Sequence, residues 1–565
     1  MDEVRRRMIR KFGDKYHIIT QTEEKMQKDK GNILIFPAER ANQYLNDLSN
    51  EGLDLFILDE FYKITNHANS SDKRVHIVQN VSDKIRKVAK QTYYLCPNVS
   101  EISESEKTNF LENMEIITLN FKTVALNTFN YSKVNKENKF KRLKKILKQC
   151  ENDKNLIYFK SKIELKKQYK KLEQLSNKRE NQLLQSFERW IGHYYSSTWD
   201  FCRYISFGFG QHHADLHRFI QQMQIKLYEE NPNFNNMLTT TSLIEGVNTS
   251  AKNVILWDNF VANKPMRSFT YKNIIGRGGR MFRYFVGNIY LLAEPPSEEH
   301  EELKIEADDE FLYRKERGEY QTEKQKDAET VLKEKYGLDK LALIKEKIIN
   351  YEILMSIEEI SNITQYPKFT QCINTLNYLN RENQDFSKAS ILYYRDFAKT
   401  IKSGIQGLDN LYLTKIMGFF SQNYKESIQK ITGELKIDIY TYCALEKNLV
   451  YEGSKFLNDF NTLQKILFPE KNIDISSFVT KMSHAFLPKN IFYLEEWGLP
   501  RMISKKIHQA GIINLEDDNI PFENVIEKFK TEIDKDFLIK TLKNEGSFFE
   551  FDDEFIKYFY EGLGI

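Results

Sequence analysis

The stretch Leu53-Asp54-Leu55-Phe56-Ile57-Leu58-Asp59-Glu60 decides the fold that we expect for this chain of 565 residues. An apolar run that ends abruptly in two carboxylates is typical of a strand in a parallel sheet. Because α/β sheets build their sites at the carboxyl ends of such strands, we expect Asp59 and Glu60 to emerge at a functional edge. The alternative is a strand that simply ends in solvent-exposed acids.

Similar short apolar runs extend outward from this strand and alternate with charged stretches of helical character. The first series contains NILIF, TYYLC and MEIITL, and the second contains NLIYF, NMLTTTS, NVILWD and NIYLLAE. After Pro295 and Pro296 helical periodicity dominates. We therefore predict an α/β fold with two parallel-sheet domains, residues 1–126 and 127–296, followed by a mainly helical accessory region at residues 297–565.

The composition limits the possible partners and the cellular setting. With 83 basic and 80 acidic residues the net charge is +3, so any affinity for nucleic acid must come from a local basic face. The five cysteines are far apart and never form C-x-x-C, which argues against zinc sites and disulfides and favours a reducing, cytoplasmic setting. No apolar run approaches the roughly 18 residues of a membrane helix, so we expect no membrane partner.

Two further segments have residue types that suit a phosphate-binding site. TTTSLIEGVNTSAKNVILWD, at residues 239–258, has small residues that let backbone amides approach anionic oxygens. NIIGRGGR, at residues 273–280, places Arg277 and Arg280 three apart on a glycine-rich turn. Guanidinium groups remain charged and bind oxygens in pairs, which suits a triphosphate. Taken alone, the first could be a glycine turn after a strand, and the second a basic surface loop.

In this order and spacing, the three segments resemble motifs II, V and VI of the superfamily-two helicases. FGFGQHHADLHRF, at residues 207–219, resembles a histidine segment of the Ski-like DExH subgroup. The resemblance covers about Met1 to Glu294 and implies two RecA-like domains, the first incomplete. Complete members use ATP and Mg²⁺ to move these domains along single-stranded or partly duplex nucleic acid. Helicases with this arrangement also occur in bacterial antiviral systems, so the resemblance suggests antiviral defence as the pathway.

The resemblance also implies a role for each matching residue. Asp59 would hold Mg²⁺, Glu60 would orient or deprotonate the attacking water, and the two arginines would stabilise the transferring phosphoryl group. The nucleotide would contact Gly246, Asn248, Asn273 and Gly276, and the nucleic acid would contact Thr240, Thr241, His212 and His213. The alternative for the two histidines is that they are packed or hydrogen-bonded in the core.

Several positions depart from the family pattern. Tyr62 stands where the family has His or Asp, Asp215 replaces a glycine, and Asn273 replaces the usual glutamine. At motif III, Leu95-Cys96-Pro97-Asn98 stands in place of S-A-T. These residues normally link the nucleotide to the facing domain, so the departures concern the coupling of hydrolysis to unwinding.

The phosphate-binding loop that such enzymes need, G-x-x-x-x-G-K-S/T, has no match in the sequence. LIFPAERA, at residues 34–41, resembles motif Ib, so we expect the chain to begin inside the first RecA-like domain and to be inactive as an ATPase when isolated. The missing strand would leave a backbone edge and an apolar surface to be covered. One alternative is a nonhydrolytic nucleic-acid-binding or partner subunit of a split helicase, completed by a polypeptide that supplies the P-loop half. Another is a fragment that does not fold alone.

Two other segments have a structural and a functional interpretation. The lysine-rich runs at residues 141–148 and 166–171 are more typical of solvated helix faces than of phosphate tracks. WGLPRMISKKIHQAGIINL, at residues 497–515, faintly resembles a helix-hairpin-helix, although a simple helix pair is the commoner explanation.

Overall fold

The computed structural model describes residues 2–65, 74–97, 99, 101–119, 124–169, 171–244, 251–279, 284–297, 302–367, 369–379, 427–546 and 548–565. The chain divides into two compact units. Unit 1 comprises Met1–Ala307, Glu496–Leu499 and Ile533–Ile565, and unit 2 comprises Asp308–Glu495 and Pro500–Glu532. In the described ranges no helix is both long and apolar enough to cross a membrane.

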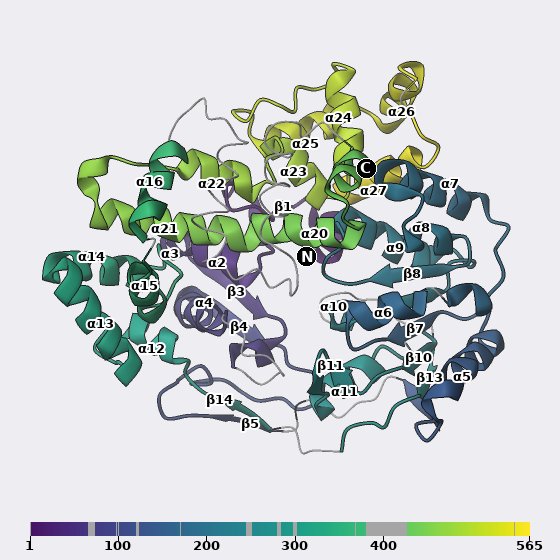
Figure 1. Cartoon of the computed structure of the whole chain (residues 1–565), viewed down its shortest axis with the longest axis horizontal. Coiled ribbons are helices and arrows are strands. Elements are labelled where there is room, and N and C mark those ends of the chain that lie inside the picture. The colour runs from purple at the N-terminus through teal and green to yellow at the C-terminus, as the bar shows by residue number, and fades with distance from the viewer. Residues whose placement is uncertain are drawn as a thin grey trace. The chain divides into compact units, whose positions relative to one another are not determined.

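Unit 1 contains a six-stranded sheet in which every pair of neighbours is parallel (Figure 1). In spatial order its strands are β6 (Ala125–Asn130), β13 (Val286–Leu291), β10 (Asn253–Leu256), β7 (Asn155–Tyr158), β9 (Asn236–Thr239) and β8 (Phe209–His212). The last four are buried at every position, as expected for parallel strands covered on both faces. The predicted α/β class and parallel sheet are confirmed.

A row of asparagine side chains crosses this sheet at one level. Asn155 on β7 donates to Asn236 on β9 and accepts from Asn253 on β10, both at 2.9 Å. Asn253 in turn accepts from Asn288 on β13 at 2.9 Å, and Asn127 on β6 donates to Asn288 at 3.4 Å. These five residues occupy matching register positions in five successive strands. We call this row the asparagine ladder. It joins polar groups that would otherwise be unsatisfied in the core.

Seven helices of the described residues belong to this sheet region, and two of them, α5 and α7, begin at a capping asparagine. They are α5 (Lys136–Gln149), α6 (Lys162–Tyr169), α7 (Gln182–Ile191), α8 (Asp200–Ile205), α9 (Arg218–Glu230), α10 (Thr241–Ile244) and α11 (Ser268–Ile275). Asn135 caps α5 by accepting the backbone N–H of Asn138 at 3.1 Å. The α5 lysines at 141, 144, 145 and 148 are exposed while Leu143, Ile146 and Leu147 are buried, which is the pattern of a solvated helix face.

The N-terminal part of unit 1 contains parallel strand pairs. These are β1 (Tyr16–Ile19) with β2 (Gly31–Leu34), β3 (Leu53–Leu58) with β4 (Ala89–Tyr94), and β5 (Glu101–Glu104) with β14 (Glu302–Ile305). The helices around them are α1 (Asp2–Phe12), α2 (Ala38–Gln43), α3 (Leu45–Glu51), the short 3-10 helix η1 (Phe61–Ile64) and α4 (Val75–Val88). A small antiparallel pair, β11 (Phe260–Val261) and β12 (Lys264–Pro265), precedes α11.

The first and last helices of unit 1 are joined by two buried arginines. On α1, Arg5 donates to the carbonyl of Gly562 at 2.9 Å, and Arg6 donates to that of Tyr558 at 2.6 Å. Both acceptors lie on α27 (Asp552–Leu563), which follows α26 (Lys535–Asn544). A Cβ on Gly562 would lie 2.6 Å from a guanidinium nitrogen of Arg6, so only glycine permits this approach. Residues 533–565 therefore complete unit 1.

Unit 2 is mainly helical, which confirms a helical C-terminal region. Its described helices are α12 (Asp309–Lys315), α13 (Glu323–Tyr336), α14 (Leu338–Ile349), α15 (Ile357–Thr364), α16 (Phe369–Leu379), α19 (Ile428–Leu435), α20 (Ile439–Asn448), α21 (Ser454–Leu467), α22 (Ser476–Ser483), α23 (Lys489–Glu496), α24 (Arg501–Gln509) and α25 (Phe522–Thr531). Arg501, in the segment that resembles a helix-hairpin-helix, is buried between Glu446 and Glu495 at 2.6 Å from each. The positive charge of Arg501 is thus paired with these two carboxylates in the interior of unit 2.

The asparagine ladder gives a stability prediction. Replacing Asn155 with alanine leaves the amide oxygen of Asn236 without its ladder partner in the core. It also removes one hydrogen bond each from the Asn253 amide N–H and the Cys150 carbonyl, both of which keep a bond to Asp153. We expect the free energy of unfolding, measured by urea denaturation, to fall by roughly 2–4 kcal/mol. Asn127→Ala, at the exposed end of the ladder, is the matched control and should change it by less than about 0.5 kcal/mol. Equal losses in the two variants would contradict a cooperative buried ladder.

Candidate functional site

The two carboxylates predicted from the sequence lie directly after β3. Asp59 is exposed, and its Oδ1 accepts the backbone N–H of Glu60 at 2.9 Å. Glu60 has a left-handed backbone, with φ 56° and ψ 43°, and its Oε2 accepts a hydrogen bond from Lys63 Nζ at 2.5 Å. Left-handed backbone in a non-glycine residue is costly and is often found at functional sites. Here it turns the chain sharply from the strand into η1 and fixes where the Glu60 side chain leaves the backbone.

Arg277, from the glycine-rich turn, lies within electrostatic reach of Glu60. Burial lowers the pKa of the Arg277 guanidinium, and the negative charge of Glu60 opposes that shift most strongly, with smaller contributions from Tyr62 and Glu3. A guanidinium keeps its charge despite such a shift because its ordinary pKa is far above neutrality. Glu60 and Arg277, which are far apart in the sequence, are therefore near enough in unit 1 for their charges to interact. Lys63, which the sequence analysis did not identify, adds a second cation there.

An aromatic contact also joins the two segments. The ring of Tyr62 lies 4.6 Å from the ring of Phe269 between centroids, at an interplanar angle of 63°. Both side chains are buried. Phe269 is on α11, the helix that ends next to Arg277. Tyr62 thus joins the two segments through a packed ring, a contact that the sequence did not reveal.

The glycine-rich turn owes its composition to close packing. The Gly279 N–H donates to the carbonyl of Ala251 at 2.7 Å, and the Ala251 N–H donates to that of Arg277 at 3.0 Å. A Cβ on Gly278 would lie 2.7 Å from the side chain of Ile289, and Gly279 has a φ of 86°. Side chains at these two positions would push the turn away from the sheet. The turn is held by the segment that includes motif V, and that backbone positions Arg277.

The histidine segment and motif V meet at the carboxyl edge of the six-stranded sheet. Ser242 Oγ lies 3.2 Å from His212 Nδ1 and 3.4 Å from Thr240 Oγ1. His212 ends β8, and Thr240 follows the end of β9. Thr241 begins α10 and is half-buried. Ser242 is the centre of this small network, and the sequence analysis missed it because no pattern marks a serine that bridges two strand ends.

Both histidines are held in the neutral form by burial. Removal from water lowers the pKa of His212 to about 4 and that of His213 to about 3. Each side chain is at most 3% exposed. At neutral pH neither carries a positive charge toward a phosphate. Their location favours packing of the strand end, and a contribution to nucleic-acid binding remains a prediction.

The remaining predicted residues fall into two groups. Asn273 is half-buried on α11, and Gly276 is exposed at the end of that helix, one residue before Arg277. Gly246, Asn248 and Arg280 lie outside the described residues. Of the two carboxylates and two arginines that were predicted to meet, only the pair Glu60 and Arg277 can be described, and the meeting of all four stays a prediction.

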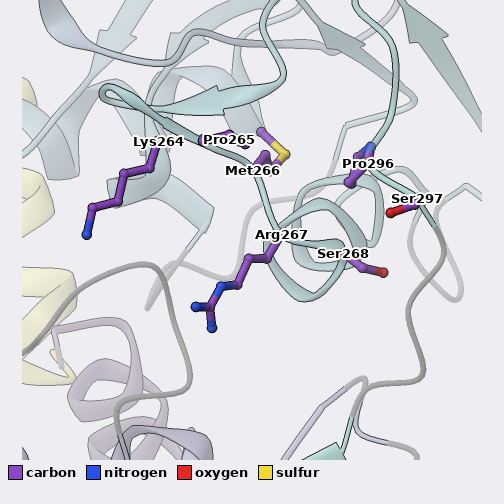
Figure 2. Close-up of a pocket in the computed structure, with 7 residues that line it drawn as sticks. All are labelled: Lys264, Pro265, Met266, Arg267, Ser268, Pro296 and Ser297. Atoms are coloured by element: carbon purple, nitrogen blue, oxygen red, sulfur yellow. The ribbon is translucent and has the colours of Figure 1, made fainter.

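A surface pocket of about 470 Å³ lies at the other end of α11. Its lining comprises Lys264, Pro265, Met266, Arg267, Ser268, Pro296 and Ser297, and the long side chains of Lys264 and Arg267 extend outward from the loop (Figure 2). Arg277 follows the opposite end of α11, an eight-residue helix of about 12 Å, whereas the Tyr62 ring packs against Phe269, beside the pocket-lining Ser268. We do not assign the predicted nucleotide contacts to it.

The residues around Glu60 fit part of a magnesium nucleotide. Carboxylate oxygens such as those of Asp59 and Glu60 are ligands that Mg²⁺ accepts, directly or through water. A guanidinium such as that of Arg277 suits the terminal phosphate oxygens. No loop of the G-x-x-x-x-G-K-S/T type occurs in the sequence to hold the inner phosphates. These residues therefore suit the metal and the terminal phosphate of the nucleotide, and the sequence offers no such loop for the inner phosphates.

Comparison with known proteins gives one informative similarity. No protein-family model matches the chain. The chain is similar to anti-bacteriophage protein B of Escherichia coli strain K12, with 32% identity over 305 residues. The aligned region covers 53% of this chain and 40% of that protein, so the chain spans less than half the length of this curated relative.

Proposed function

We propose that this chain is the greater part of a superfamily-two helicase motor with two RecA-like domains, acting on nucleic acid in bacterial defence against phage. In this proposal ATP hydrolysis depends on a phosphate-binding loop that the sequence does not contain. The observation that supports it best is the approach of Glu60 and Arg277, which are far apart in the sequence and of the charge types that phosphoryl transfer requires. The name of the E. coli relative supports the pathway.

The proposed roles follow from the chemistry of each side chain. Bound Mg²⁺ and ATP would supply the reactive phosphoanhydride and the charge that neutralises its oxygens. Asp59, which is open to solvent, would hold the metal through its carboxylate oxygens. Glu60 would orient a water molecule and accept its proton, after exchanging its bond to Lys63 for that water. Arg277 would bind the oxygens of the terminal phosphate, with its own side chain already half-desolvated.

Coupling to nucleic acid would pass through packed elements. The contact between Tyr62 and Phe269 joins η1 to α11. A movement of the carboxylates would therefore displace the helix that positions Arg277. The carboxyl edge of the six-stranded sheet offers Thr240 and Thr241 as hydroxyl contacts to a sugar-phosphate backbone, with Ser242 and His212 supporting them from behind. Such contacts hold a strand without reading its bases.

A second candidate function is a nonhydrolytic subunit that is completed by another polypeptide. The absence of the phosphate-binding loop from the sequence favours it, because that loop supplies most of the ground-state grip on the nucleotide. The two proposals share the nucleic-acid contacts and differ in whether the carboxylates ever catalyse hydrolysis.

The first test is nucleotide binding by the isolated chain. We expect no steady-state ATP turnover, but a weak, Mg²⁺-dependent affinity for a fluorescent ATP analogue. Arg277→Ala should lower that affinity about tenfold, since one charge-assisted contact contributes roughly 1.5–3 kcal/mol. Arg267→Ala, which removes an equal charge at the other end of α11, should leave it unchanged. Equal affinities of wild type and Arg277→Ala would count against the proposed site, and turnover that Arg277→Ala abolishes would refute the expected inactivity.

The second test concerns the contact between motifs II and VI. A double-mutant cycle of Tyr62→Ala and Phe269→Ala, followed by chemical denaturation, should give a coupling free energy of about 0.5–1.5 kcal/mol. The coupling arises because either single substitution already breaks the ring contact, so the second substitution has no contact left to remove. Pairing Tyr62→Ala with Phe260→Ala, an exposed ring in the same unit, is the control and should be additive. Additivity in both cycles would show that the two motifs do not pack together in solution.

A further inference from the structure

A small polar cavity in unit 1 lies among charged side chains from distant parts of the chain. Its volume is about 20 Å³, and its lining includes Asp2 and Arg5 of α1, Arg40 of α2 and Arg218, the first residue of α9. Glu496, the last residue of α23, also lines it and belongs to unit 1. A water-sized particle needs roughly 10–15 Å³, so the cavity accommodates one such particle.

Both acids of the cavity are already paired with arginines. Asp2 accepts hydrogen bonds from two arginines of α1, at 2.5 Å and 2.8 Å. Both carboxylate oxygens of Glu496 lie 3.0 Å from one guanidinium nitrogen of Arg40. Burial would raise the pKa of the Glu496 carboxyl, but the charges of Arg40 and Arg218 outweigh it and hold that pKa below its ordinary value. Because the two carboxylates stay ionised and have arginine partners, the cavity does not suit a metal cation.

Positive charge is in excess around the cavity. The described lining residues include three guanidinium groups and two carboxylates, and Arg6, which shares Asp2, adds a fourth guanidinium beside them. Arg218 is half-buried and makes no hydrogen bond to another described residue, although its charge acts on Glu496. Burial is the largest influence on the pKa of Arg5 and lowers it, as expected for a cation held away from water. Buried cations without enough counter-charge are costly, so this group of side chains favours a further negative charge.

A buried hydroxyl in the lining supports the same conclusion. Thr20 follows β1 and is 4% exposed, and its Oγ1 has no hydrogen-bond partner among the described residues. Its carbonyl accepts from Arg40 at 2.9 Å, and its N–H donates to Glu24 at 3.4 Å, so only the hydroxyl is left over. Buried polar groups nearly always have a partner. An O–H donor and the N–H donors of guanidinium groups therefore line one cavity of the size of a single acceptor.

We propose that this cavity binds a monatomic anion of the halide class, with chloride as the natural member. The ion accepts from the Arg218 guanidinium and from the Thr20 hydroxyl, and it offsets the surplus positive charge. By linking α1, α2 and α9, which are far apart in the sequence, it stabilises unit 1. A phosphate group is too large for the cavity, so this site is distinct from the group around Glu60 and Arg277. The inference does not depend on the proposed function.

Water is the alternative occupant of the cavity. A water molecule would satisfy the hydroxyl of Thr20, but it is neutral and would leave the surplus charge of the arginines uncompensated. The two occupants differ in a measurable way, because the stability of the protein depends on halide concentration only if the occupant is the anion.

The first experiment is thermal unfolding of the full 565-residue chain while sodium chloride replaces sodium glutamate at constant ionic strength. Glutamate is too large to enter the cavity, and screening is equal throughout. Because a ligand that binds the folded state stabilises it, the wild-type melting temperature should rise with chloride by about 1 °C or more. Arg218→Gln should lose most of this rise. Arg203→Gln, which removes an exposed charge on α8, is the matched control and should keep it.

A second variant, Thr20→Val, should change the melting temperature in different directions in the two buffers. Valine has the shape of threonine without the hydroxyl. In glutamate the variant should melt at or above the wild-type temperature, because no hydroxyl without a partner is left buried. In chloride it should gain less than the wild type does, because the ion has lost a donor. A variant that melts below the wild type in glutamate would show that the hydroxyl is bonded inside the protein and would contradict the site.

Bromide locates the ion directly through its anomalous X-ray scattering. A crystal of the full chain soaked in sodium bromide should show an anomalous peak in the cavity, and a crystal of Arg218→Gln should not. A peak without any effect of halide on unfolding would mark an adventitious ion only and would overturn the proposal. A water molecule in the cavity without an anomalous peak would overturn it as well, and so would equal chloride effects in Arg218→Gln and the wild type.

Discussion

The register of the parallel six-stranded sheet is the constraint on which the rest of unit 1 depends. A slip of one residue in any strand would turn its buried side chains to the opposite face. The asparagine ladder opposes such a slip, since an amide can bond to its neighbours only when all five asparagines are level. The buried residues that follow the asparagine in β7 and in β10, Leu-Ile-Tyr and Val-Ile-Leu, would not by themselves distinguish one register from the next. Buried amides supply that discrimination because leaving one unpaired is costly.

The fixed register decides which residues reach the carboxyl edge. His212 and Thr239 are paired positions at the ends of β8 and β9, so the histidine segment and motif V must emerge side by side. Ser242 then links them through its hydroxyl. On the opposite side of the sheet, Gly287 at the start of β13 lets the turn of Gly278 approach its backbone, where a Cβ would come within 2.6 Å. The position of Arg277 is therefore a consequence of strand pairing.

The N-terminal part of unit 1 contrasts with this closed arrangement. Among the residues that the structure describes, its strands are paired two by two, and Leu55, Ile57 and Tyr93 on β3 and β4 are exposed. At the end of β3, Glu60 pairs with Lys63 and lies within electrostatic reach of Arg277.

The sequence by itself determined the elements whose signals are local. Apolar runs predicted the buried strands β7, β9 and β10, and helical periodicity predicted the C-terminal region. The carboxylates were placed correctly at the end of a strand, whereas the apolar run at residues 114–119 is not a strand. Only the tertiary structure decided the contacts between distant segments. These include the asparagine ladder, the ring contact of Tyr62 with Phe269, and the closure of α1 on α27 by Arg5 and Arg6. Periodicity reports which face of an element is buried, but a partner far along the chain leaves no periodic trace, so its identity emerges only when the chain is folded.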